Sequence, residues 1–209
     1  VVRTFEVGGT PIGKELRKLC FSKREDEKLD PVARLLMVLA ARIQHVQTVI
    51  KPALREGKVV VCDRFYPSTR VFQGDIDGLE YELFDLEQFG EDYGLGITLE
   101  PDLVLSLKID PELAYKRGKA REFVDNDTYK TGIEQAKQTA AAYEIQIDRL
   151  LDEGVNVVEI DVTDLTIAQI ELVIKDKIKE FFDDSANEEQ PLSAYADPDD
   201  VEPMQGWLA

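Results

Sequence analysis

Residues 59–74 read Val-Val-Val-Cys-Asp-Arg-Phe-Tyr-Pro-Ser-Thr-Arg-Val-Phe-Gln-Gly. The initial run of three valines and a cysteine is typical of a strand in a parallel sheet, buried on both faces. The strand ends at Asp63 and Arg64, and ligands of open α/β sheets bind at the carboxyl ends of the strands. Arginine presents a rigid fork of donors to phosphate oxygens. We therefore predict that Asp63 and Arg64 hold a metal-linked water and a phosphate side by side.

The composition is that of one ordinary globular domain. The chain has 209 residues, of which 44% are hydrophobic and 32% charged, so it is long enough to bury a core. It contains no apolar run approaching the ~18 residues of a membrane span, and it does not open with a signal-peptide pattern. Its two cysteines are Cys20 and Cys62, which we predict to be reduced core residues of a cytoplasmic protein.

The charge is acidic and unevenly distributed. Residues 183–209 contain eight acids and no Lys or Arg, so they account for −8 of the net charge of −17 and leave −9 on the body. Nucleic acid binding depends on basic residues that neutralise phosphates, so we expect no nucleic acid or membrane partner. A single mononucleotide, in contrast, needs few cations. The tail is predicted to be mobile in large part, and its Trp207 either packs on its own domain or docks on a partner.

Helices and short apolar strands alternate along the body of the chain. The pattern predicts strands at residues 1–5, 58–64, 101–110 and 155–162, and helices at residues 11–21, 31–54, 80–93, 111–122, 133–153 and 167–182. This alternation implies an α/β fold in which a parallel β-sheet is covered by helices on both faces. We assign residues 1–182 to one domain and residues 183–209 to an acidic tail.

The long helix predicted at residues 31–54 begins with two start signals, a capping Asp30 and Pro31 at the first helical position. Spacings of three and four residues define a core stripe of Leu35, Leu39, Ile43, Val46 and Ile50. A neighbouring face with the same spacing holds Val38, Arg42, His45 and Val49. The helix therefore presents both a core face and a face with polar side chains.

Three segments together resemble the motifs of the thymidylate kinase family. They are residues 5–10 (Phe-Glu-Val-Gly-Gly-Thr), residues 41–46 (Ala-Arg-Ile-Gln-His-Val) and residues 63–65 (Asp-Arg-Phe). The resemblance covers residues 1–182 and implies the P-loop NTPase fold of the nucleoside monophosphate kinases. It also implies ATP and Mg²⁺ as cofactors, transfer of the ATP γ-phosphoryl group to dTMP, and a homodimer that forms through the long helix.

The resemblance assigns roles to the residues that follow the strand at residues 58–64. Arg64 binds the phosphate of the acceptor monophosphate, and Asp63 organises Mg²⁺ and its waters. The pair Ser68 and Thr69 stands where a polar group reads the thymine edge. The substrate-binding pair Phe72 and Gln73 comes next, and Phe72 stands where the family usually has a tyrosine that crowds the sugar 2′ carbon and so favours deoxyribose.

Further acceptor residues are implied on the long helix and in the first turn. Arg42 corresponds to the family arginine that donates to a thymine carbonyl. Val38 replaces the phenylalanine that stacks on the base, so dUMP, a modified pyrimidine or a broader range of acceptors stays open. Phe5 replaces an arginine and is expected to face the nucleotide. Val7 replaces a proline, and the glycines of residues 8–9 suit a turn with unusual φ values.

A basic segment, Lys-Arg-Gly-Lys-Ala-Arg at residues 116–121, stands in the place of the family's lid over the donor phosphates. Arg117 and Arg121 are implied as the catalytic groups that stabilise charge in the transition state. His45 is the single histidine, and we predict a structural or pocket-lining role for it, because a phosphate monoester needs no base. Tyr143 either corresponds to a family aromatic near the lid or packs within its helix.

The donor-phosphate cradle has no candidate in these residues. The sequence contains no Gly-x-x-x-x-Gly-Lys-Ser/Thr loop, which in the family lies with a central strand ahead of the segment that begins here. We expect the sequence to be a shortened version of a longer protein. The sequence is compatible with three functions: a dTMP kinase, a kinase of another deoxynucleotide, and a non-catalytic nucleotide-binding or scaffold protein.

Overall fold

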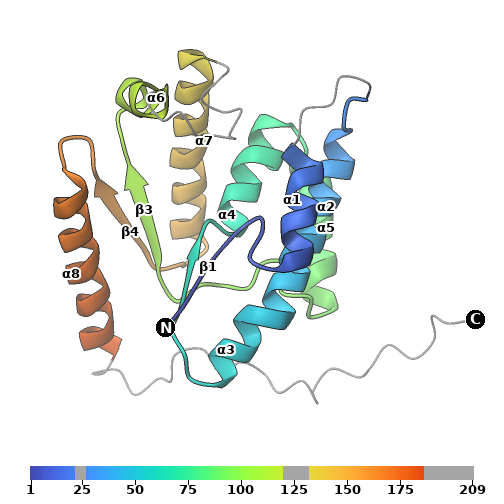
Figure 1. The fold of residues 1–209 in the computed structure, drawn as a ribbon, viewed down its shortest axis with the longest axis horizontal. Coiled ribbons are helices and arrows are strands. Elements are labelled where there is room, and N and C mark those ends of the chain that lie inside the picture. The colour runs from blue at the N-terminus through green and yellow to red at the C-terminus, as the bar shows by residue number, and fades with distance from the viewer. Residues whose placement is uncertain (22–26, 120–131, 186–209) are drawn as a thin grey trace, which may run out of the picture.

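The computed structural model describes residues 1–21, 27–119 and 132–185. The elements follow one another as β1 (Val2–Phe5), α1 (Pro11–Phe21), α2 (Pro31–His45), η1 (Val46–Ile50), α3 (Lys51–Arg55), β2 (Val60–Asp63), α4 (Tyr66–Thr69), η2 (Arg70–Ile76), α5 (Glu80–Asp92), β3 (Val104–Lys108), α6 (Pro111–Lys119), α7 (Ile133–Asp152), β4 (Val157–Asp161) and α8 (Ile167–Ser185). Helices separate the parallel strands, which confirms the predicted α/β class (Figure 1).

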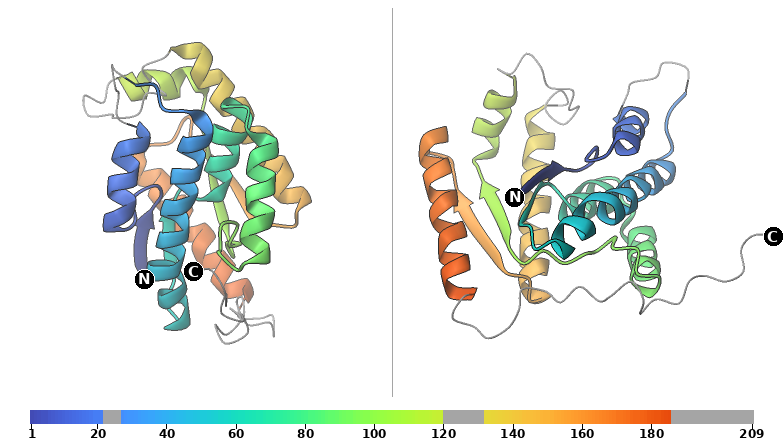
Figure 2. Two further views of the ribbon diagram at one scale, coloured as in Figure 1. Left: turned by 90° about the vertical axis from the view of Figure 1, so that its right-hand side faces the viewer. Right: turned by 60° about the horizontal axis from the view of Figure 1, so that its bottom comes forward.

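The predicted parallel pairing is confirmed, and within the described residues the strands form two parallel pairs that are not hydrogen-bonded to each other. β1 pairs with β2, and β3 pairs with β4. Val61 on β2 is 49% exposed and Leu107 on β3 is 48% exposed. Because strand side chains project from the faces of a sheet, the faces that carry these two residues are only partly covered. In Figures 1 and 2, α1 and α2 lie beside the first pair and α8 lies beside the second, on the opposite side of the molecule.

The predicted long helix is present as the continuous series α2, η1 and α3. Asp30 caps its start, since its carboxylate accepts hydrogen bonds from Val32 N at 2.9 Å and Ala33 N at 3.2 Å. The middle turn, η1, is a π-helix that ends two residues before Pro52. Proline has no N–H to donate to the preceding turn and commonly disturbs a helix there, which accounts for the wider turn.

The segment after β2 is helical, which the sequence pattern did not predict. It forms α4 and then the π-helix η2. Pro67 lies in the first turn of α4, where its fixed φ favours the helix and its missing N–H costs nothing. The helical turns place the predicted substrate residues of this segment on different faces.

Three apolar clusters hold the elements together. The first joins α2 to α5 through Leu35, Leu39, Leu79, Leu83 and Ile97. The second packs α1 on α2 through Val7, Cys20, Val38 and Ala41. The third joins α4 to α7 and the start of β4 through Tyr66, Ile147, Leu150 and Val155. Burial of each large apolar side chain contributes roughly 1.5–3 kcal/mol, so these clusters hold α2 and α4 in place.

Candidate active site at the ends of β1 and β2

The parallel register of β1 and β2 brings two distant motifs together. Phe5 lies opposite Asp63 in the ladder, and the next amide, Glu6 N, donates to Asp63 O at 3.0 Å. The two strands therefore end at the same level, so the Gly-Gly turn follows one strand while Arg64 follows the other. This is the sheet edge at which α/β proteins bind their ligands.

The turn after β1 requires glycine at positions 8 and 9 for two different physical reasons. Gly8 has φ = 132°, a conformation that side chains rarely adopt, as predicted. Gly9 is not in the positive-φ region, so the prediction of an unusual φ is wrong for it. A Cβ there would lie 2.6 Å from His45 Cδ2 and 2.7 Å from Thr4 Oγ1, and neither contact is sterically allowed. Gly9 is therefore required by the close approach of a histidine ring.

A buried ion pair lies directly beneath this turn. Arg42 on α2 is 2% exposed, and its Nε donates to Glu6 Oε2 at 2.7 Å. Its Nη2 donates to Thr69 Oγ1 on α4 at 2.6 Å, and its Cζ lies 5.1 Å from the centre of the Phe65 ring. The guanidinium thus links the turn after β1 to α2 and α4, and its charge is balanced by the Glu6 carboxylate.

His45 completes the cluster one turn along α2. Its ring is 1% exposed, with Nδ1 3.1 Å from Glu6 Oε1 and Nε2 2.6 Å from Thr4 Oγ1. Because an ionised carboxylate can only accept, Nδ1 carries the hydrogen in this arrangement. Both ring nitrogens are occupied by protein groups, which agrees with a structural rather than a general-base role.

Arg64 starts a second, more exposed group. Its φ is 67°, a sparsely populated value that in folded proteins concentrates at functional positions. The Arg64 Cζ lies 5.3 Å from the centre of the Phe72 ring, which meets Tyr143 edge-on with ring centres 6.1 Å apart. Tyr143 OH is 3.0 Å from Ser68 Oγ. Tyr143 on α7 therefore packs on Phe72 and contacts the hydroxyl of Ser68, so it connects two of the predicted substrate residues.

The remaining predicted acceptor residues differ in their surroundings. Phe5 is 40% exposed, whereas Val38 is 3% exposed and Gln73 is 6% exposed. Ser68 and Thr69, although adjacent, contact different groups, since Thr69 accepts from Arg42 and Ser68 meets Tyr143.

The basic segment is only partly described. Arg117, on α6, is exposed and its Nη2 lies 3.4 Å from Thr163 O, in the turn after β4. Asp63 is also exposed at the end of β2. Arg121 lies outside the described residues. The structure thus gives Arg117 a partner on the β4 side and leaves its predicted contact with phosphate as a prediction.

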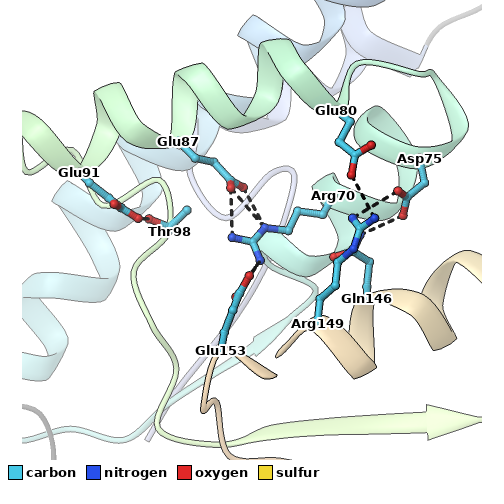
Figure 3. Close-up of polar contacts among 9 residues, drawn as sticks. All are labelled: Arg70, Asp75, Glu80, Glu87, Glu91, Thr98, Gln146, Arg149 and Glu153. Atoms are coloured by element: carbon cyan, nitrogen blue, oxygen red, sulfur yellow. Dashed lines mark hydrogen bonds and ion pairs between the residues drawn. The ribbon is translucent and has the colours of Figure 1, made fainter. Parts of the chain in front are cut away.

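The helix that carries the acceptor residues is anchored by Arg70 (Figure 3). Its Nε and Nη2 donate to the buried Glu87 of α5 at 3.1–3.2 Å, and its Nη1 donates to both oxygens of Glu153 at 2.8 and 2.9 Å. Glu153 directly follows α7. Arg70 therefore holds the junction of α4 and η2 between two other helices.

We expect Arg70→Ala to lower the free energy of unfolding by about 2–4 kcal/mol, because it leaves Glu87 buried without its counter-charge. Urea unfolding monitored by circular dichroism measures this change. Lys175→Ala is the matched control, since its pair with Glu171 is exposed at both side chains and is worth at most about 1 kcal/mol. Equal effects of the two substitutions would show that the Arg70 contacts do not anchor the segment.

Cys62 on β2 lies near the acid of the buried pair. Burial, and secondly the charge of Glu6, raise the pKa of its thiol from 9.0 to about 12. Alkylation requires the thiolate, so in a Cys20→Ser background we expect iodoacetamide to react with the protein at pH 8 roughly 100-fold or more slower than with free cysteine. The rate should continue to rise about tenfold per pH unit from pH 8 to 10. A plateau above pH 9 would contradict the raised pKa.

Sequence reasoning missed the polar groups that support Arg42. Glu6 and Thr4 were not singled out as site residues, and His45 was predicted to be structural or pocket-lining without a named partner. One available signal was the acid in an otherwise apolar first motif, and another was the three-residue spacing of Arg42 and His45 on one helix face. Their convergence depends on β1 packing against α2, which no local pattern specifies.

Comparison with known proteins agrees with these motifs. A family model described as thymidylate kinase matches residues 1–171. A thymidylate kinase of Teredinibacter turnerae is 42% identical over 125 residues, 60% of this chain and 58% of the relative. One of Ectopseudomonas mendocina is 38% identical over 160 residues, 74% and 73% of the two chains. The crystal structure of thymidylate kinase from Ehrlichia chaffeensis has the same fold, with a TM-score of 0.58 at 23% identity over 86% of this chain and 80% of that one. The chain belongs to the thymidylate kinase family.

Proposed function

We propose that the protein is a nucleoside monophosphate kinase that phosphorylates dTMP to dTDP with ATP. The observation that carries this proposal is the pairing of the buried Arg42–Glu6 cluster with the exposed Arg64 at one sheet edge. The first offers fixed hydrogen-bond donors of the kind that read a base, and the second offers a cation for a phosphate. The names of the relatives support the same reaction.

The acceptor half of the site follows from these residues. Arg64 binds the monophosphate through its planar fork of donors, and the Phe72 ring under its guanidinium limits the directions that the fork can take. Phe72 and Tyr143 form an aromatic wall of the kind that excludes a ribose 2′-hydroxyl by contact. Arg42 and Ser68–Thr69 supply polar groups for the base edge.

The donor half involves ATP and Mg²⁺. Among the described residues there is no group of three or more acidic, cysteine or histidine side chains that could hold a metal. Mg²⁺ in kinases is commonly bound by one or two carboxylates, substrate phosphates and water, so the exposed Asp63 fits that role. When bound, Mg²⁺ neutralises charge on the phosphates. Arg117 and Arg121 would stabilise the charge of the transferring phosphoryl group.

The test is ATP-dependent ADP release by the complete gene product, including any residues encoded before Val1. dTMP, dUMP and dCMP are compared as acceptors, and Arg64→Ala is the inactive control. Turnover with one pyrimidine, lost in the control, supports the proposal. Tight monophosphate binding without turnover would replace it with a non-catalytic binding or scaffold function. No monophosphate binding at all would refute both the kinase and the non-catalytic binding function.

A kinase for another deoxynucleotide is the second candidate, and Val38 favours it. The Val38 side chain is aliphatic and is buried against Val7, Cys20 and Ala41. It therefore offers the base no aromatic ring, and a stacked aromatic is worth roughly 1–3 kcal/mol per base. Weaker stacking on the thymine ring lowers the preference for thymine and favours acceptance of dUMP or a modified pyrimidine. A lower KM for dUMP than for dTMP in the same assay would establish this candidate.

A homodimer through α2 is part of the proposal. Val32 and Leu36, one turn apart on α2, are 37% and 48% exposed, and they provide an apolar stripe on the long helix. Light scattering after size-exclusion chromatography tests the dimer, and Leu36→Lys should shift it toward monomer.

A cytoplasmic location is also proposed, supported by the absence of a disulfide between Cys20 and Cys62. Within the residues that the structure describes, no helix has both the length and the apolar character needed to cross a membrane.

A further inference from the structure

The guanidinium of Arg42 is held in one orientation and still has donors to spare. Glu6 takes its Nε–H, Thr69 takes an Nη2–H, and Phe65 lies against its face. Its Nη1 is buried, and among the described residues none accepts a hydrogen bond from it. A buried donor left unpaired costs roughly 1–3 kcal/mol, so this atom requires an acceptor that residues 1–21, 27–119 and 132–185 do not provide.

The orientation of Arg42 depends on a carboxylate that is itself fixed at both oxygens. Glu6 Oε2 accepts from Arg42, and Glu6 Oε1 accepts from His45 Nδ1. Without the histidine, Oε1 loses its partner and the carboxylate is free to rotate about its terminal bond. The arginine that is hydrogen-bonded to the other oxygen would then turn with it.

The His45 imidazole is in turn held in place at Nε2, the ring nitrogen that faces away from Glu6. Thr4 Oγ1 lies 2.6 Å from Nε2, and the missing side chain of Gly9 leaves room for the same edge of the ring. With Nδ1 donating to Glu6, a neutral ring accepts from the Thr4 hydroxyl at Nε2. The series Thr4, His45, Glu6 and Arg42 is therefore continuous, and the part of the chain that the structure describes supplies no acceptor to complete it at Nη1.

We propose that His45 is a positioning residue for recognition of the acceptor base. Through the shared Glu6 carboxylate it orients Arg42 so that Nη1 is left for an acceptor atom of the pyrimidine. The inference rests on the proposed function, since it requires that Arg42 meets the base. It predicts that His45 acts on base recognition and leaves phosphate recognition by Arg64 unchanged.

Two amide substitutions of His45 test the contacts of the two ring nitrogens separately. The Nδ2 of asparagine can occupy the place of Nδ1, so His45→Asn keeps a donor toward Glu6. The terminal amide of glutamine reaches the place of Nε2, so His45→Gln keeps the contact with Thr4 and loses Glu6. The dissociation constants of residues 1–209 for dTMP and for 2-deoxyribose 5-phosphate, which lacks the base, are measured by calorimetry for wild type and both variants.

We expect His45→Gln to reduce the preference for dTMP over 2-deoxyribose 5-phosphate about five- to tenfold, as for loss of one hydrogen bond. The affinity for 2-deoxyribose 5-phosphate itself should change less than about twofold, and His45→Asn should retain most of the preference. An unchanged preference in His45→Gln, or equal weakening of both ligands, overturns the inference and leaves the proposed function standing. A wild-type protein that binds both ligands equally overturns the proposed function as well.

A second measurement does not depend on the variants folding. His45 is the single histidine of the chain, so its ring ¹⁵N resonances are assigned without ambiguity in histidine-labelled protein. We expect a protonated Nδ1 and an unprotonated Nε2, and a shift of Nδ1 on addition of dTMP but not of 2-deoxyribose 5-phosphate. Identical responses to the two ligands would refute the positioning role.

Discussion

Replacement of Glu6 by alanine is expected to lower the free energy of unfolding by about 3–5 kcal/mol. Without Glu6, the guanidinium charge of Arg42 remains at a site that is 2% exposed. Removal of one partner from a buried ion pair leaves the desolvation of the other without compensation. Since most domains are stable by only about 5–15 kcal/mol, the variant should unfold at much lower urea concentration, which equilibrium unfolding measures.

The matched control for Glu6→Ala is removal of both charges. Glu6→Gln combined with Arg42→Met takes away the ion pair without leaving an isolated charge, and such replacements are often close to neutral for stability. We expect this double variant to recover at least half of the loss while it fails to distinguish dTMP from 2-deoxyribose 5-phosphate. A loss below about 1 kcal/mol for Glu6→Ala alone would show that the pair does not stabilise the fold.

Replacement of Arg64 by alanine is expected to weaken binding of dTMP to residues 1–209 by about 100- to 1,000-fold. Each hydrogen bond to a charged group contributes roughly 1.5–3 kcal/mol, and a guanidinium makes two to one phosphate. Arg64 is exposed at the strand end and its side chain rests on Phe72, so its loss should have little effect on stability. Isothermal titration calorimetry at constant ionic strength measures the change.

Two further variants test whether the loss of dTMP affinity is specific to the guanidinium of Arg64. Arg64→Lys keeps the charge but not the fork and should lose about tenfold. Arg3→Ala removes another exposed arginine, on β1, and should change affinity by less than about twofold because exposed charges act weakly through solvent. If Arg3→Ala and Arg64→Ala weaken dTMP equally, the phosphate is attracted by general charge and not bound at the end of β2.

The local patterns of the sequence were sufficient for the elements and the motifs. The strand pattern of β2, the Asp30 cap and the two-faced helix from residue 31 each depend on neighbours within a few residues, because backbone propensity, capping and periodicity are local properties. The same patterns were insufficient after Arg64, where α4 and η2 form around tertiary contacts of Tyr66 and Arg70. They were also insufficient for the sheet, which is divided into two pairs in the described residues.

The sequence by itself determined the family, the α/β class and the position of Asp63 and Arg64 at a strand end, because a motif is read from adjacent residues. Tertiary structure alone decided what surrounds Arg42. Glu6 and Arg42 are 36 positions apart, and Thr4 and His45 are 41 apart, so their contacts exist only once β1 packs on α2. Burial makes those contacts strong, since the local dielectric constant falls and unpaired polar groups become costly. The role of Gly9 depends on the same packing, because the histidine ring that it accommodates comes from another element.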